Sequence, residues 1–467
     1  MKSEHDLITD LQTLKTNEKN PPSPESECDE EGFYLIDDSV YNEEIDLDSF
    51  PWLDPNHPLY FPPTQTNDRN ETTRWSAVDK FSVENWYPYL IKHTFKSYFI
   101  QLNYEDIQYL MGTPPTEYVY TKLDAMFNEA LTQFSNNEAF LRLSTRSPKD
   151  SQYLFKEAAS IMSNDLVYWN ELDNKNQQLV SFVVSMLKAM KITNGRKIID
   201  TIAQSPRVFG DLIALTSSVD PSECVTNVIL REWHDIRPDH EFRVFVSRRL
   251  RKESIVTAIS QYFHFLYFDK TPADCFNFLD EQTRQVFITQ LEHYVLKSVD
   301  PEVAQFLNYS SEQDEDDSSD CIREYIVDLA LIPENQYHGA ITDENKLILG
   351  GNTYIMVVIE LNPFAPAATG CALFNWKNDL MTLWGKADCD YPVFSCRTSP
   401  REEFDTVSLL PAQYKSVIEN ALSRRLANAP THGFLINQRD RFFTQEQSYS
   451  ANQSEQPKES FNLSSSL

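Results

Sequence analysis

The hydrophobic positions along the chain follow two different spacings, and together these predict a mixed α+β protein. Leu123, Met126, Phe127 and Leu131 recur every three or four residues, which predicts an amphipathic helix over residues 120–134. The same spacing predicts further helices over residues 103–111, 152–162, 177–192, 196–204 and 283–299.

Short apolar runs rich in β-branched and aromatic residues predict strands between these helices. The runs cover residues 95–102, 140–143, 227–233, 241–246, 255–260, 325–332 and 354–361. The turn formed by residues 237–240, which contains Pro238 and Asp239, predicts that strands 227–233 and 241–246 form an antiparallel hairpin. Gly350 and Gly351 lie in a polar connection between the last two strands.

The two ends of the chain lack these patterns. Residues 1–75 are acidic and poor in long apolar runs, which predicts a largely disordered extension, and residues 437–467 read as a polar disordered tail. The part between them predicts two subdomains, residues 76–225 and residues 226–436.

Composition narrows the function classes. A net charge of −29, from 41 Lys and Arg against 70 Asp and Glu, argues against direct nucleic-acid binding. The 10 glycines form neither GxxxxGK[ST] nor GxGxxG, so neither phosphate-binding motif is available. The 7 cysteines form no CxxC pair, which indicates reduced thiols and no zinc signature. With no apolar leader at the start and no run long enough for a membrane span, we expect a cytoplasmic protein without a membrane segment.

The strand over residues 354–361 ends in polar side chains. Glu360 and Asn362 are two positions apart and therefore point to the same side of the strand, where two oxygen donors suit Mg²⁺. Taken alone, these two residues are explained more simply by an ordinary strand end with a solvated Glu and a turn Asn. Asp328, in the preceding strand, can lie across from Glu360 if the strands are antiparallel neighbours, and this third donor favours the metal site.

A polar turn over residues 144–151 separates a predicted strand from a predicted helix and carries Arg146 and Lys149. This order can place main-chain N–H groups and two cations beside an anion. A solvated connecting loop accounts for the turn as well.

Several motifs occur in the order and approximate spacing of a known family. They include the segments 86–88, 141–150, 228–233, 241–246, 258–261 and 360–364. In this ordered set the chain, from Trp86 to Trp376, resembles the cell division cycle protein 123 family. That family consists of ATP-grasp proteins that help assemble eukaryotic translation initiation factor 2 by binding its gamma subunit.

The resemblance implies an ATP-grasp fold, in which two α+β subdomains with antiparallel sheets enclose a cleft for ATP and Mg²⁺. Arg231, Glu232, Trp233 and His234 would form the hinge against which adenine lies. Arg142 and Arg243 would supply phosphate-binding cations. Asp328, Glu360 and Asn362 would hold Mg²⁺ next to the ATP phosphates. Simple surface salt bridges with Glu232 or Glu241 are the alternative for Arg231 and Arg243.

The chain departs from the family pattern at three places. Arg142 stands where the family usually has Lys, and Glu360 stands where it has Asp. Tyr262 and Phe263 replace the usual Arg-Asp pair, which removes one phosphate contact and one acid. The chain is thus identified as a divergent member.

The function implied is an ATP- and Mg²⁺-binding chaperone for assembly of translation initiation factor 2, acting by binding rather than turnover. No catalytic residues are assigned, because no nucleophile and base occur at a telling spacing. One alternative is an ATP-grasp ligase or phosphotransferase. Another is a secreted effector that imitates the host factor in the host cytoplasm, for which the polar C-terminal tail is a weak signal.

Overall fold

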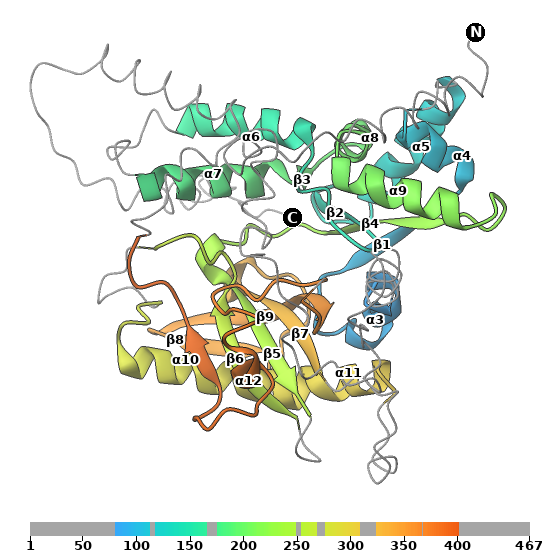
Figure 1. The fold of residues 1–467 in the computed structure, drawn as a ribbon. Helices are drawn as coiled ribbons and strands as arrows, with labels where there is room; N and C mark the ends of the chain where they lie inside the picture. Colours follow the sequence, from blue (N-terminus) through green and yellow to red (C-terminus); the bar gives the residue numbers. More distant parts are fainter. Residues whose placement is uncertain are drawn as a thin grey trace, which may run out of the picture.

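Two β-sheets organise the part of the chain that the computed structural model describes, and each has its own helices (Figure 1). The described residues are 80–112, 117–165, 175–248, 254–268, 276–308, 324–366 and 368–400. The predicted extension over residues 1–75 and the predicted tail over residues 437–467 lie outside them.

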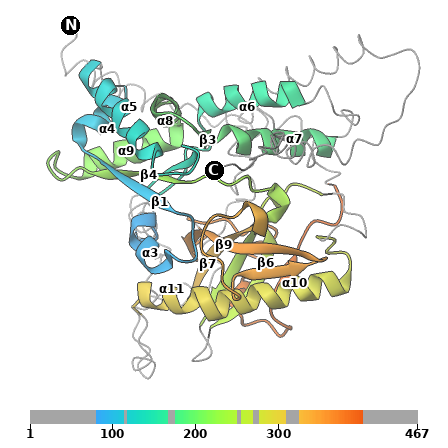
Figure 2. The ribbon, with the colours of Figure 1, turned by 180° about the vertical axis from the view of Figure 1, so that it is seen from behind.

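The first sheet has the strand order β1-β4-β2-β3 and is antiparallel throughout. Its strands are β1 (Ser97–Leu102), β2 (Ala139–Leu143), β3 (Lys191–Ile192) and β4 (Thr226–Glu232). Four helices share a hydrophobic core with this sheet: α4 (Tyr104–Leu110), α5 (Glu117–Leu131), α8 (Gly195–Ala203) and α9 (Pro206–Ser218). The helices α6 (Gln152–Asp165) and α7 (Lys175–Ala189) pack on each other beside them (Figures 1 and 2).

Local sequence explains where two of these helices begin. Asn194 accepts a hydrogen bond from Lys197 N at 2.9 Å, and Ser205 Oγ accepts one from Val208 N at 3.2 Å. Both residues are N-caps that satisfy free backbone donors of the first helical turn, and Pro206 then starts α9 with a suitable φ.

The second sheet has the order β10-β6-β5-β7-β9-β8 and is antiparallel except where β10 runs parallel to β6. Its strands are β5 (Glu241–Ser247), β6 (Ile255–Gln261), β7 (Glu324–Pro333), β8 (Lys346–Leu349), β9 (Asn352–Pro363) and β10 (Val393–Ser395). Gly350 and Gly351, with φ of 58° and 80°, make the tight turn from β8 to β9, a conformation that glycine adopts without strain.

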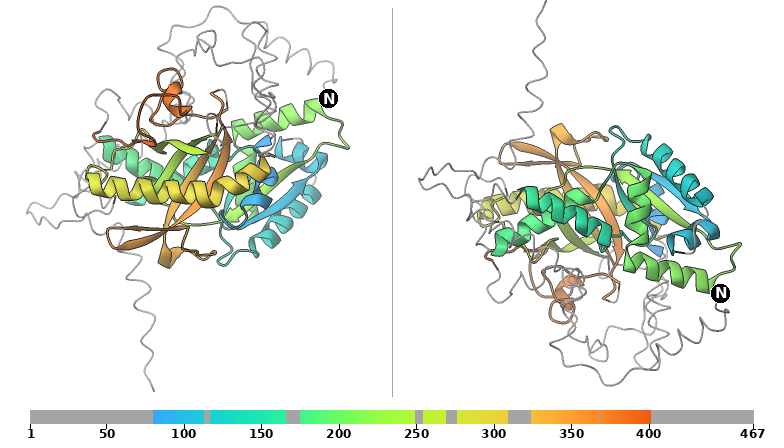
Figure 3. Two further views of the ribbon diagram at one scale, coloured as in Figure 1. Left: turned by 90° about the horizontal axis from the view of Figure 1, so that it is seen from below. Right: turned by 90° about the horizontal axis from the view of Figure 1, so that it is seen from above.

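One face of the second sheet is covered by a long helical rod. Helix α10 (Glu281–Tyr294) continues through a π-helical turn (Val295–Val299) into α11 (Asp300–Phe306). The rod crosses the strands on the side away from the first sheet (Figures 1 and 3). Phe242, Val244 and Val327 point into the core beneath it. The short helix α12 (Leu380–Leu383) packs with Phe245 and Ile326 on the opposite face.

Helix α3 (Val83–Leu90) precedes the first sheet in sequence but shares its core with the second. The side chain of Trp86 is completely buried, and its Nε1 donates to Phe81 O at 3.1 Å. The Phe81 ring meets Phe306 of α11 edge to face at 5.7 Å. The second subdomain is therefore built from two separate parts of the chain.

The predicted α+β class with two antiparallel sheets is confirmed, but two details of the prediction are wrong. Strands β4 and β5 do not form a hairpin, because β4 pairs with β1 and β2 while β5 pairs with β6 and β7. The sheets therefore divide after β4, not before it as the predicted boundary at residue 226 has it. The turn at residues 237–240 contains a short 3-10 helix (Pro238–His240), and it leads the chain from one sheet to the other.

Among the residues that the structure describes, no helix combines the length and the apolar character needed to cross a membrane.

Candidate functional site

A row of polar side chains crosses the middle of the second sheet. Glu360 of β9 pairs with Asp328 of β7, Asp328 pairs with Arg243 of β5, and Arg243 pairs with Ser260 of β6. Directly paired residues of neighbouring antiparallel strands point to the same side. We call Ser260, Arg243, Asp328 and Glu360 the polar row.

The polar row lies between two apolar patches on the same face of the sheet. Phe245 and Ile326 belong to the cluster on one side, and Ala330 and Val357 belong to the cluster on the other. The charged side chains of the polar row are therefore flanked by apolar residues on both sides. Buried charges in such surroundings require polar or charged partners. Arg142 of the first sheet provides one of them, which places this face toward the first subdomain.

Asp328 is held by Arg243 in a two-pronged ion pair. Its Oδ1 accepts from Arg243 Nε at 2.9 Å and its Oδ2 from Arg243 Nη2 at 3.0 Å. Asn362 Nδ2 donates to the same Oδ2 at 3.0 Å. Burial raises the pKa of the Asp328 carboxyl above its ordinary value, and the positive charge of Arg243 opposes that rise. The three predicted metal donors therefore lie in one cluster, as the strand register predicted.

Glu360 forms an ion pair that spans the two sheets. Its Oε1 accepts from Nη2 of Arg142, a residue of β2, at 2.7 Å. The Arg142 side chain is only 3% exposed, whereas that of Glu360 is 27% exposed. Burial raises the pKa of the Glu360 carboxyl, but Arg142, Lys149 and Arg243 outweigh this effect and leave that pKa below its ordinary value. Glu360 is thus the charged member of the row that solvent reaches.

Three side chains that the sequence did not assign to the site complete its charge pattern. Lys149 Nζ donates to the Tyr262 hydroxyl at 3.4 Å and lies 5.4 Å from the centre of its ring. The guanidinium carbon of Arg243 lies 5.0 Å from the same ring centre. Tyr262, which was expected only to remove a phosphate contact, instead contacts two cations of the site.

Glu241 is the third of these side chains. It lies two residues before Arg243 and therefore on the same face of β5. Burial raises the pKa of its carboxyl to about 7, and the negative charge of Asp328 adds to the rise while Lys149 opposes it. The two-residue spacing of Glu241 and Arg243 was visible in the sequence, whereas nothing in the sequence indicated that Lys149 would lie near them.

The two cations of the polar turn over residues 144–151 have different partners. Arg146 Nε lies 2.6 Å from Asp211 Oδ2, so this cation is paired within the first subdomain. The turn also supplies an anion of its own, because Asp150 lies at the N-terminus of α9. Its carboxylate accepts from Ser205 Oγ at 2.6 Å and from Arg207 N at 2.8 Å. Lys149 alone reaches the vicinity of the polar row.

The predicted hinge residues lie where the chain passes from the first sheet to the second, but their side chains point into different surroundings. Arg231 donates to Ile359 O and, at 2.6 Å, to Thr94 Oγ1. The His234 ring packs between Phe95 and Tyr337, with ring centres 5.2 and 5.6 Å away. Trp233 lies with its ring centre 5.7 Å from Lys191 Nζ.

Arg231 is buried and binds the main chain next to Glu360. Burial lowers the pKa of its guanidinium to about 9, which leaves the group charged at neutral pH. The contacts of Arg231 and Arg243 rule out the alternative in which each pairs with Glu232 or Glu241 on the surface.

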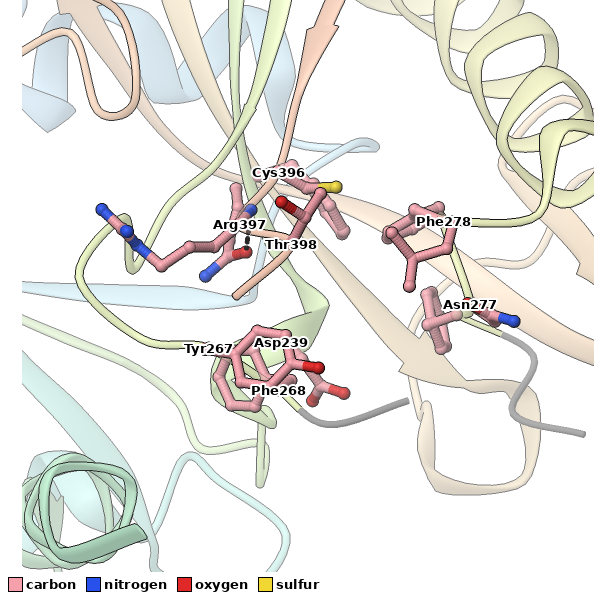
Figure 4. Close-up of a pocket in the computed structure, with 12 residues that line it drawn as sticks. Asp239, Tyr267, Phe268, Asn277, Phe278, Cys396, Arg397 and Thr398 are labelled. Atoms are coloured by element: carbon pink, nitrogen blue, oxygen red, sulfur yellow. Dashed lines mark hydrogen bonds between the residues drawn. The ribbon is translucent and has the colours of Figure 1, made fainter. Parts of the chain in front are cut away.

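A hollow open to solvent, whose lining side chains are drawn in Figure 4, is lined by none of the predicted site residues. Its lining combines aromatic side chains, among them Phe242, Tyr267 and Phe278, with polar and charged ones. Phe242 points to the α10 side of the sheet, opposite to Arg243, so this hollow is not continuous with the polar row.

No group of three or more His, Cys, Asp or Glu side chains within the described ranges is placed to hold a metal ion. The predicted magnesium ligands Asp328, Glu360 and Asn362 are not such a group, because they comprise two carboxylates and one amide.

Two α+β subdomains with antiparallel sheets, facing each other across a row of acidic and basic side chains, form the arrangement expected of an ATP-grasp protein. The sequence model of the D123 family matches residues 181–407. Over these residues the chain is similar to the cell division cycle protein 123 family expected from its motifs.

A curated CDC123-like protein of Acanthamoeba polyphaga mimivirus is 25% identical over 182 residues, which make up 38% of this chain and 45% of that protein. The chain thus spans less than half the length of this relative. Two solved structures of Cdc123 from Schizosaccharomyces pombe, one of them C-terminally truncated, give TM-scores of 0.39 and 0.41 at 16% and 15% identity. Each alignment covers 68% of this chain and 96% of the other.

Proposed function

We propose that the chain binds Mg-ATP between its two sheets and acts as an assembly factor. Asp328, Glu360 and Asn362 would hold Mg²⁺, and Arg142 and Arg243 would bind the phosphates. The observation that carries the proposal is the polar row, in which acidic donors and cations from both sheets meet on one sheet face.

The residues present fit a magnesium ion in their chemistry. Carboxylate and amide oxygens are the donors that Mg²⁺ prefers, and these three side chains are neighbours on β7 and β9. Once bound, Mg²⁺ would bridge and neutralise phosphate oxygens. Lys149 adds a third cation for phosphate charge, near Arg243 on the ring of Tyr262.

Residues 231–234 remain the proposed adenine hinge. A strand end that passes from one sheet to the other suits this role, because main-chain N–H and C=O groups can read the edge of the base. Glu232 N already donates to Lys96 O at 2.8 Å, so the main chain of Trp233 and His234 would do most of the reading.

The proposed partner is translation initiation factor 2, bound through its gamma subunit. The match to the D123 family model supports an assembly role in general. A net charge of −29 favours a partner with a basic surface. We expect binding and assembly in the cytoplasm rather than turnover of ATP.

Titration calorimetry with Mg-ATP tests the nucleotide site. Glu360→Ala removes a proposed metal donor and leaves Arg142 without its carboxylate, so we expect Mg-ATP to bind at least about 10-fold more weakly. The matched control is Glu129→Ala, which removes an exposed glutamate of α5 and should bind like the wild type. Equal affinity of all three proteins would refute the assignment of the site.

Capture of initiation factor 2 subunits by the full chain tests the partner. We expect the gamma subunit to be retained by the wild type in Mg-ATP, and to be retained less by Glu360→Ala. Absence of capture with and without Mg-ATP would refute the assembly role. Release of phosphate in the absence of any partner would instead favour a transferase or ligase.

A further inference from the structure

Two of the proposed metal donors are already neutralised by arginines, and one of these ion pairs joins the two sheets. Asp328 forms a two-pronged ion pair with Arg243 within the second sheet. Glu360 of the second sheet is paired with Arg142 of the first at 2.7 Å. A magnesium ion that approached these carboxylates would have to take both of them from buried guanidinium groups.

Exchange of this kind is strongly unfavourable for a bare metal ion. Arg142 is buried in β2, so loss of Glu360 would leave its charge in a poorly hydrated place. A divalent cation at the same carboxylates would also repel Arg142, Arg243 and Lys149. The phosphates of ATP remove both costs, because they give the arginines new anionic partners as Mg²⁺ takes the carboxylates.

We propose that the Arg142–Glu360 pair is an exchangeable latch between the sheets, opened only when Mg²⁺ and the nucleotide bind together. This inference rests on the proposed function and adds to it the order of binding and the element that responds. When the latch exchanges, the link between the sheets passes from the ion pair to the nucleotide and its metal.

Arg231 makes a second link between the sheets and also binds the segment that precedes β1. Arg231 of β4 donates to Ile359 O of β9 and to Thr94 Oγ1. Thr94 Oγ1 in turn donates to Val358 O at 2.7 Å, and Val358 N donates to His93 O at 2.7 Å. The Arg231 bond to Ile359 O thus links β4 to β9 independently of the Arg142–Glu360 pair.

Thermal unfolding and calorimetry of the full chain with MgCl₂ alone, ATP with EDTA, and Mg-ATP test the latch. For the wild type we expect no shift in Tm with MgCl₂ alone and a clear rise with Mg-ATP. Arg142→Gln frees Glu360, so its affinity for Mg²⁺ alone should rise by about 10-fold or more while its affinity for Mg-ATP falls. Arg196→Gln is the control, because Arg196 is 76% exposed and pairs with Asp200 on the surface of α8.

The outcomes separate the latch from the proposed function. If MgCl₂ alone stabilises the wild type as much as Mg-ATP does, the latch is refuted and the nucleotide site stands. If Mg-ATP does not bind the wild type, the nucleotide site is refuted. In that case the coupling between Arg142 and Glu360 is measured in the ligand-free protein, from the Tm values of Arg142→Gln, Glu360→Gln and the double variant.

In that comparison the double variant should lose less Tm than the sum of the two single losses, which identifies the two side chains as coupled. Additive losses would overturn the latch. Should Arg142→Gln fail to fold, the wild-type titrations and the charge-conserving Arg142→Lys decide the matter.

Discussion

At the scale of single residues, burial beside the polar row raises the pKa of the Glu241 carboxyl. The pKa of Glu241 is raised to about 7 in the folded chain, against 4.5 for an ordinary glutamate. Between these two values the folded state binds more protons than the unfolded state, so stability falls as pH rises. The stabilising effect of the raised pKa is complete below pH 4.5 and lost above pH 7.

We therefore predict that Glu241→Gln changes the pH dependence of unfolding measured without Mg²⁺ or nucleotide. Gln imitates the protonated carboxyl, so the variant should avoid a loss of about 3 kcal/mol that the wild type suffers between pH 4.5 and pH 8. Denaturant unfolding at several pH values measures this difference. Glu129→Gln, at an exposed position, should track the wild type. Parallel curves for Glu241→Gln and the wild type would contradict the raised pKa.

The sequence predicted the three proposed metal donors of the site but not their charged partners. Period-two alternation placed Glu360 and Asn362 on one side of a strand, and an antiparallel neighbour placed Asp328 opposite, as the register has it. The partners of these carboxylates could not be predicted, because Arg142 lies more than two hundred residues from Glu360 and on the other sheet. The position of Lys149 depends on how the two subdomains dock, which no local pattern encodes.

At the scale of elements, the free edge of the second sheet is protected by a side chain. Gln290 of α10 accepts from Ile348 N at 2.9 Å and donates to Ile348 O at 3.1 Å, so it imitates a neighbouring strand beside β8. Ile348 itself is 58% exposed. An edge strand with exposed apolar side chains and free backbone groups favours pairing between molecules.

We predict that Gln290→Ala increases self-association more than it lowers stability. The variant exposes one backbone donor and one acceptor on the edge strand β8, which a second molecule can then bind. Light scattering at increasing protein concentration measures the effect. Gln285→Ala, at an exposed position on the same helix, should remain as dispersed as the wild type. A Gln290→Ala protein that stays equally dispersed would show that the edge needs no such protection.

Most helices and strands could be predicted from the chain, and the exceptions have physical causes. The hydrophobic spacing predicted α5, α7, α8 and α10 and the central strands to within a few residues of their bounds. The hairpin of β4 and β5 was wrongly predicted because a turn with Pro and Asp fits a hairpin and a crossing between sheets equally well. Helix α9 was missed, although Ser205 and Pro206 form a good start signal.

At the scale of the whole molecule, the placement of α3 ties the first described helix to the second subdomain. Trp86 is buried among residues of β9, α10 and α11, and not in the core beneath α5 and α8. We predict that Trp86→Ala costs about 3–5 kcal/mol of unfolding free energy. The loss should fall mainly on the second subdomain.

Hydrogen exchange of the backbone amides measures where the loss falls. In Trp86→Ala the strands β5, β7 and β9 should lose more protection than α5 and α8. Phe127→Ala, which removes a buried ring of the first core, should show the reverse pattern. Equal loss in both subdomains for both variants would show that the two cores unfold as one unit.

The position of α3 also gives the chain the topology of one domain inserted into another. The first sheet and its helices are contained within residues 97–232, between α3 and β5. The insertion begins and ends side by side, because Ser97 pairs with Arg231 and Glu232 N binds Lys96 O. A segment whose two ends meet in this way can be exchanged between relatives, lengthened or replaced at the level of the gene without moving the strands of the host domain. Loss of the segment would remove Arg142 and Lys149 from the site in a single step, while Asp328, Glu360 and Asn362 would remain.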